Sequence, residues 1–199
     1  MRNVVKAVLL ILLFATIAWA AAQRMPLDGL STGGCDWASG CTVANLDEDP
    51  DGAGTDWAVS TNNNTSHTGH FSFGTPTDPL TDGANLQGFR VSAREAASCG
   101  TGTPTLRIEL WESNTLIRAG GENNVTAVFG CTQGTDCDVF ELLWNATEIT
   151  TAANVEVKVF STKAGGAPSV RCAVDIGAVE WNADTTAAPA STRRIWTTQ

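Results

Sequence analysis

A side-chain period of two runs through the body of this chain and limits it to β-structure. Residues 106–111 (LRIELW) and 155–160 (VEVKVF) alternate apolar with other side chains, as strands with one buried face do. Further short runs of this kind occupy residues 42–46, 57–60, 70–73, 86–93, 116–119, 125–129, 139–144 and 170–181. Clusters of Gly, Asn and Pro separate the runs, and only residues 145–150 suggest a helical turn. About ten short strands joined by close turns predict an all-β fold, an antiparallel β-sandwich of jelly-roll type.

The last of these strands keeps its alternation only if it contains a bulge. Strict alternation from Val174 would turn Val179 and Trp181 toward water and Glu180 toward the core. One extra residue at Gly177-Ala178 turns both acids, Asp175 and Glu180, outward and brings four apolar side chains to the core face: Val174, Ile176, Val179 and Trp181. We therefore expect a β-bulge at Gly177.

Six cysteines indicate an oxidising compartment. They are Cys35, Cys41, Cys99, Cys131, Cys137 and Cys172. Five residues separate Cys35 from Cys41 and, again, Cys131 from Cys137, whereas no C-x2-C spacing typical of zinc sites is present. Sequence alone leaves the connectivity open. Adjacent pairing is the simplest scheme, and it leaves Cys99 to Cys172, so that three disulfides would staple the sandwich.

The first 22 residues have the pattern of an export leader. Arg2 and Lys6 precede an apolar run over residues 7–22, and the small side chains at 18–22 (AWAAA) allow cleavage before Ala21 or Gln23. The alternative is a retained membrane anchor, although 16 apolar residues are fewer than the ~20 of a spanning helix. We expect four segments: a leader or anchor at 1–22, an N-terminal segment with a small cysteine loop at 23–41, the β-sandwich at 42–184 and a flexible tail at 185–199.

The charge and the scarcity of catalytic side chains restrict the function classes. The chain has 21 acidic and 12 basic residues, and removal of the leader with Arg2 and Lys6 would shift the net charge from −9 to −11. Nucleic-acid binding requires a basic surface, so we do not expect it. There is no Tyr, no hydrolase or phosphate-loop motif, and no evident carboxylate or thiol near His67 or His70 in the sequence. We therefore expect no enzyme activity and no catalytic residue.

Several short stretches occur together in a recognisable order. They are LDEDPDG at 46–52, Trp57, FGTP at 73–76, PL at 79–80, FRV at 89–91, TPTLRIELWE at 103–112, WNAT at 144–147, ANVEV at 153–157 and VDIGAVEWNA at 174–183. Over residues 42–184 this succession resembles an uncharacterised β-sandwich module of phage virion and tail-associated proteins and of bacterial surface or exported proteins. The resemblance implies a structural or adhesive role and brings no catalytic residues with it. The leader and the cysteines depart from the module and suggest a version adapted to an oxidising exterior or to membrane attachment.

Asp47, Asp49 and Asp51 place three carboxylates at alternate positions of a turn-rich segment, an arrangement that suits Ca²⁺. The EF-hand pattern is incomplete, because Ala58 stands where its last glutamate belongs and Pro50 interrupts the loop. Asp is also common in ordinary solvated turns. Calcium is the only cofactor that the sequence suggests, and a plain acidic turn is the alternative.

Two tryptophans are candidate platforms for a sugar. Trp37 lies inside the Cys35–Cys41 loop, and Trp111 points away from the apolar face of its strand. Exposed aromatic rings of this kind stack on sugars, although large aromatic residues are more often buried.

Three functions follow from these observations. The first is a structural or interaction protein of a virion or extracellular surface assembly, with protein partners. The second is a secreted carbohydrate-binding adhesin with glycan partners, and the third is a glycosidase-like enzyme. All three place the protein outside the cell, at the cell surface or on a virion, with membrane contact only if residues 1–22 are retained.

Overall fold

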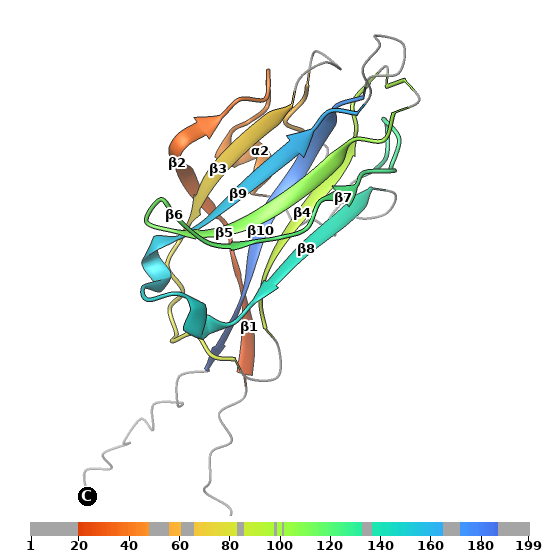
Figure 1. Ribbon diagram of the computed structural model, residues 1–199. Helices are drawn as coiled ribbons and strands as arrows, with labels where there is room; N and C mark the ends of the chain where they lie inside the picture. Colours follow the sequence, from red (N-terminus) through yellow and green to blue (C-terminus); the bar gives the residue numbers. More distant parts are fainter. Residues whose placement is uncertain are drawn as a thin grey trace, which may run out of the picture.

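The chain forms two packed antiparallel β-sheets (Figure 1). The computed structural model describes residues 20–47, 56–60, 66–82, 86–97, 99–100, 102–132, 137–164 and 172–186. The first sheet contains, in spatial order, β1 (Ala20–Met25), β10 (Val174–Thr186), β4 (Gln87–Glu95) and β8 (Asp138–Trp144). The second contains β2 (Leu27–Cys35), β3 (His67–Phe73), β9 (Val155–Thr162), β5 (Thr105–Glu112) and β6 (Thr115–Ala119), and β7 (Asn123–Asn124) also pairs with β5. The predicted all-β sandwich is confirmed.

The order of the strands is that of a jelly roll. After β3 in the second sheet, the chain passes to β4 in the first, returns for β5 and β6, and then alternates through β8, β9 and β10. The order β1-β10-β4-β8 therefore faces the order β3-β9-β5-β6, and β2 extends the second sheet by one edge strand. Every strand pair is antiparallel.

Aromatic rings from both sheets fill the centre of the core. Phe73 of β3 stacks on Phe89 of β4 with 5.5 Å between the ring centroids, and Trp144 and Trp181 lie 5.7 Å apart beside them. All four residues are buried. Their alternation with outward-facing residues is the pattern from which the strands were predicted.

The bulge predicted at Gly177 is present. The pairing of β10 with β4 shifts between Ile176 and Ala178, and Val179 and Trp181 are buried in the core. A Cβ atom at Gly177 would lie 3.0 Å from side-chain atoms of Ser92 and Trp57, so the site also has little room for a side chain. Glu180 lies on the outer face as expected, but arginines cover it and leave it only 2% exposed. Asp175, also expected to face outward, is fully buried because Ser60 and Arg94 pack against it.

Two of the predicted strands are absent, and the predicted helical turn is present. Residues 42–46, predicted as a strand, contain the helical turn α2 (Val43–Leu46), which buries Leu46 between the sheets. Residues 125–129 form no strand, because Val125 alone enters the core while Val128 and Phe129 are exposed in a turn. The expected helical turn at 145–150 is present as η1 (Ala146–Glu148), followed by η2 (Ala152–Asn154).

The sandwich also begins upstream of residue 42. Strand β1 pairs with β10 from Ala20↔Thr186 to Met25↔Trp181, and β2 pairs with β3. Residues 20–22, assigned to the leader, and 23–35, assigned to an N-terminal segment, thus contribute strands to both sheets. Apolar alanines and a Gly-rich stretch concealed the strand pattern there.

The two ends of the sandwich differ. At one end Ala20 is paired with Thr186, so both ends of the described chain lie together there. Cys35, Cys99, Cys137 and Cys172 flank strand ends on the opposite side, where Val174 pairs with Glu95 and Ala93 pairs with Asp138. We call the latter the disulfide end. Among the described residues, no helix is long and apolar enough to span a bilayer.

Candidate functional site

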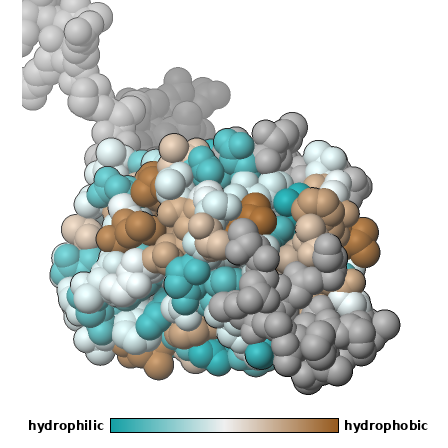
Figure 2. Space-filling model, turned by 90° about the horizontal axis from the view of Figure 1, so that it is seen from above, coloured by the Kyte–Doolittle hydropathy of each residue, from teal (hydrophilic) through white to brown (hydrophobic). Residues whose placement is uncertain are grey.

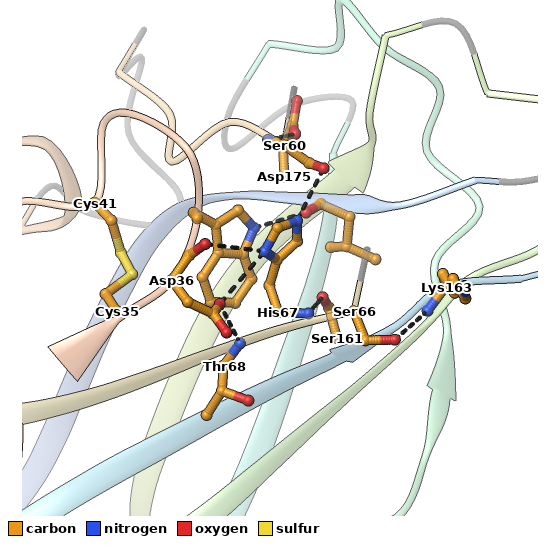
Figure 3. Close-up of polar contacts among 12 residues, drawn as sticks. Cys35, Asp36, Cys41, Ser60, Ser66, His67, Thr68, Ser161, Lys163 and Asp175 are labelled. Carbon is orange, nitrogen blue, oxygen red and sulfur yellow. Dashed lines mark hydrogen bonds and ion pairs between the residues drawn. A yellow bond between two sulfur atoms is a disulfide. The ribbon is translucent and has the colours of Figure 1, made fainter. Parts of the chain in front are cut away.

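A group of interconnected polar side chains lies at the disulfide end (Figure 3). Here the loop after β2, the segment 56–60, the start of β3 and the start of β10 meet. We call Asp36, Ser60, His67, Arg94 and Asp175 the His67 network. Four of the five residues are buried, and only the carboxylate of Asp36 is exposed, at 59% of its side-chain area.

His67 occupies the centre of this network. Its Nε2 lies 2.9 Å from Ser60 Oγ, and its Nδ1 lies 3.2 Å from the backbone oxygen of Asp36 and 3.3 Å from Asp36 Oδ1. The ring stacks on Trp37 at 5.1 Å between centroids. The carboxylate of Asp36 also accepts a hydrogen bond from the amide of Thr68, which fixes the loop after β2 against β3.

A buried ion pair forms the other half of the network. Asp175 is fully buried; its Oδ1 accepts a hydrogen bond from the amide of Ser60 at 2.8 Å, and its Oδ2 lies 3.4 Å from Nε of Arg94. Burial raises the pKa of the Asp175 carboxyl, although Ser60 and Arg94 oppose this shift. The guanidinium of Arg94 lies 3.8 Å from the ring centroid of Trp57 and 4.8 Å from that of Phe129.

The side chains of Ser60, His67 and Asp36 follow the order of a serine hydrolase triad, but their surroundings do not suit that chemistry. A nucleophile must reach substrate, and Ser60 is only 5% exposed. A tetrahedral oxyanion needs hydrogen-bond donors, whereas the amide of Ser60 already donates to the carboxylate of Asp175, whose charge would repel an oxyanion. Within the described residues, the contacts of the network link five segments of the disulfide end: the loop after β2, residues 56–60, β3, β4 and β10.

Both histidines have carboxylate partners that the sequence did not reveal. His70 faces the outer side of the second sheet, with Nδ1 2.8 Å from the backbone oxygen of Thr32 and Nε2 3.2 Å from Glu156 Oε2. Asp36 lies 31 residues before His67, and Glu156 lies still further along the chain from His70. These partners meet because β2 and β9 both pair with β3. Local spacing carries no signal for such contacts.

Three disulfides join Cys35 to Cys41, Cys99 to Cys172 and Cys131 to Cys137. These are the pairs of the adjacent scheme. The first and third close loops of 6 residues' separation, whereas the second spans 73 and joins the segment after β4 to the segment before β10. All three support the same end of the sandwich.

The two tryptophans expected as sugar platforms lie in different surroundings. Trp37 is not an exposed platform: it is 4% exposed, its Nε1 donates to the backbone oxygen of Val174, and its ring packs in the core. The prediction of an exposed ring is wrong because the disulfide loop folds inward over β10. Trp111 does face outward and is half-buried, but Lys158 Nζ lies 4.7 Å from its ring centroid and its Nε1 donates to Glu109.

The proposed calcium ligands are only partly within the described residues. Asp47 ends the turn of α2, and its backbone oxygen accepts a hydrogen bond from Arg24, whereas Asp49 and Asp51 lie outside the described residues. Elsewhere in the described part, Glu95, Cys99 and Cys172 lie close enough to surround an ion, but both cysteines are in a disulfide and offer no thiolate.

Comparison with protein-family models and with curated protein sequences finds no match for this chain.

Proposed function

We propose that this chain is a non-enzymatic structural or interaction protein of a virion or an extracellular surface assembly. The observation that supports this most directly is the difference between its two ends. Ala20 and Thr186 lie side by side at one end, and all three disulfides support the other. A domain held through its termini at one end presents the opposite end to its surroundings.

The disulfides support an extracellular setting for this role. Three disulfides indicate an oxidising environment, because reducing compartments do not maintain them. They strengthen the end that such an attachment would present, where covalent links limit local opening. The end-on view in Figure 2 shows apolar areas separated by polar ones among the described residues, as on a surface exposed to water.

The fold and the sequence resemblance are consistent with this proposal, but neither is sufficient to establish it. Jelly rolls occur in viral capsid proteins and in lectins, and a fold alone does not determine a function. The burial of Trp37 and the position of Lys158 over Trp111 leave the adhesin alternative without a supporting observation in the described residues.

Immunogold electron microscopy of the native source tests the proposal. Antibodies raised against the folded domain should label particles, filaments or the cell surface, and the protein should sediment with them. If the protein were found only as a free monomer in the medium, the proposal would be wrong.

A further inference from the structure

A small pocket lies on the outer face of the first sheet, far from the His67 network. Its volume is about 220 Å³, and Leu86, Gly88 and Leu143 form its apolar part while Arg90, Glu141 and Asn182 form its polar rim. The pocket exists because Gly88 has no side chain: Gly88 pairs with Leu143 on one side and with Asn182 on the other, so its neighbours surround an empty position. A Cβ atom there would already lie 3.2 Å from Leu143 Cδ2.

The pocket leaves apolar surface exposed. Leu86, directly before β4, and Leu143 of the edge strand β8 are 44% and 49% exposed. No aromatic ring is among the described residues that line it, so a sugar would find no ring to stack on. The volume is below the ~300–1,000 Å³ typical of small-molecule sites and suits one or two side chains of a peptide.

The rim carries an acidic group on the accessible side. Glu141 is half exposed and lies 3.1 Å from Arg90, whose other nitrogen contacts the buried Glu180. Arg24 also contacts Glu180, so two carboxylates and two guanidinium groups form this cluster, of which Glu141 is the most exposed. A peptide with an apolar side chain next to a cationic one would match the apolar part of the pocket and Glu141 on its rim.

The chain itself contains such a sequence close to the pocket. Arg193, Arg194, Ile195 and Trp196 follow β10. The strand ends at Thr186, only four residues beyond Asn182, and seven peptide units from Thr186 to Arg193 span up to roughly 25 Å. Asn182 lies about 13 Å back along the strand, so the reach is sufficient. A short tether also raises the local concentration of a weak ligand to about the millimolar range.

We propose that Ile195 and Trp196 dock intramolecularly in the pocket over Gly88, with Arg193 and Arg194 against Glu141. This inference is independent of the proposed function, because the pocket and the tail belong to the chain whether or not it joins an assembly.

Methyl NMR of the full chain tests the docking. A docked indole ring shifts nearby methyl signals, so Trp196→Ala should change the methyl shifts of Leu86 and Leu143 and leave those of Leu116 unchanged. Leu116 is a matched control, since it is 47% exposed but lies on β6 of the other sheet. The shifts should not depend on protein concentration.

A second measurement follows the tail itself. Limited trypsin digestion, followed by intact mass, reports cleavage after Arg193 and Arg194. Leu143→Asp and Gly88→Val, which fills the pocket, should each accelerate this cleavage about tenfold, whereas Leu116→Asp should not. Unchanged Leu86 and Leu143 methyl shifts in Trp196→Ala would overturn the proposal. Shifts that grow with protein concentration would also overturn it, because they would identify a second copy as the source of the tail.

Discussion

At the scale of single residues, buried charges rather than exposed ones organise the disulfide end. Asp175 is fully buried, and its contacts reach Ser60 in one segment and Arg94 in another. A buried carboxylate without its cation is costly, because the charge has lost its hydration. The network therefore links the stability of this end to a few side chains.

Arg94→Leu should lower the free energy of unfolding by about 3–5 kcal/mol at neutral pH, because Asp175 stays buried without its cation. Burial raises the pKa of Asp175, so the folded protein binds a proton at a higher pH than the unfolded chain. The stability difference between the wild type and Arg94→Leu should thus become smaller as the pH falls through the raised pKa of Asp175, because the protonated carboxyl no longer needs a cation. Denaturant unfolding at several pH values measures both effects.

Arg118→Leu is the control for this variant. Arg118 is 41% exposed and contacts Glu148 at the surface. Its replacement should therefore lower the free energy of unfolding by less than ~1 kcal/mol and show no comparable pH dependence. Equal losses in the two variants would show that Asp175 does not depend on Arg94.

Glu112→Gln should lower the free energy of unfolding by about 1 kcal/mol at neutral pH. Burial tends to raise the pKa of Glu112, but hydrogen bonds from the hydroxyl and amide of Thr150 and the amide of Thr151 outweigh it and lower the pKa. The stability that Glu112 contributes is therefore present above the unfolded pKa of ~4.3 and is lost as the pH falls through the folded pKa. The wild type and Glu112→Gln should converge in acid, whereas the exposed control Asp28→Asn should be as stable as the wild type at neutral pH.

Ser60 should not react with a fluorophosphonate probe, because it is buried and its amide is bound to Asp175. Intact mass after incubation gives the answer. Stoichiometric labelling that disappears in Ser60→Ala would show a working nucleophile and contradict a non-enzymatic role.

Residue roles could be predicted only where the pattern is local. The bulge at Gly177 followed from the alternation of its own strand, and the spacing of Cys35 and Cys41 suggested their bond. The partners of His67 and Asp175 could not be predicted, because they come from segments that only the sheet order brings together.

At the scale of elements, alternation revealed the central strands and failed at the edges. Strand β9 alternates buried and half-buried residues along most of its length, β5 does so over its first half, and β10 keeps its apolar residues on the core face through the bulge at Gly177. Strand β1 begins within a run of small apolar residues that also fits a leader, and β2 contains glycines with positive φ at positions 33 and 34 and an irregular register. Edge strands bury less of either face, so their sequences carry less of the pattern.

Among the disulfides, the bond between Cys99 and Cys172 should contribute most to stability. In the chain-entropy account its long loop gives ~4.5 kcal/mol, against ~2.4 for each of the two short loops. The double variant Cys99→Ala/Cys172→Ala should therefore lower the melting temperature more than Cys131→Ala/Cys137→Ala. Calorimetry of the two variants decides, and a larger effect of the short loop would contradict this order.

At the scale of the whole molecule, the two ends of the sandwich differ. The strand order places the ends of β1 and β10 together and gathers the cysteine-bearing segments at the other end of the sandwich. The sequence indicated the fold class and the exterior setting, but the separation of the two ends became visible only from the register. That separation is the physical basis of the proposed role in an assembly.

The most direct test compares the accessibility of the two ends in the intact native assembly. One variant carries a short epitope tag in the exposed turn at Val128 and Phe129, at the disulfide end, and a matched variant carries the same tag after Gln199. The account predicts strong antibody labelling of the first on intact particles or cells, and labelling of the second only after the assembly is dissociated. Equal labelling of both tags, or failure of the protein to associate with any particle or surface, would contradict it.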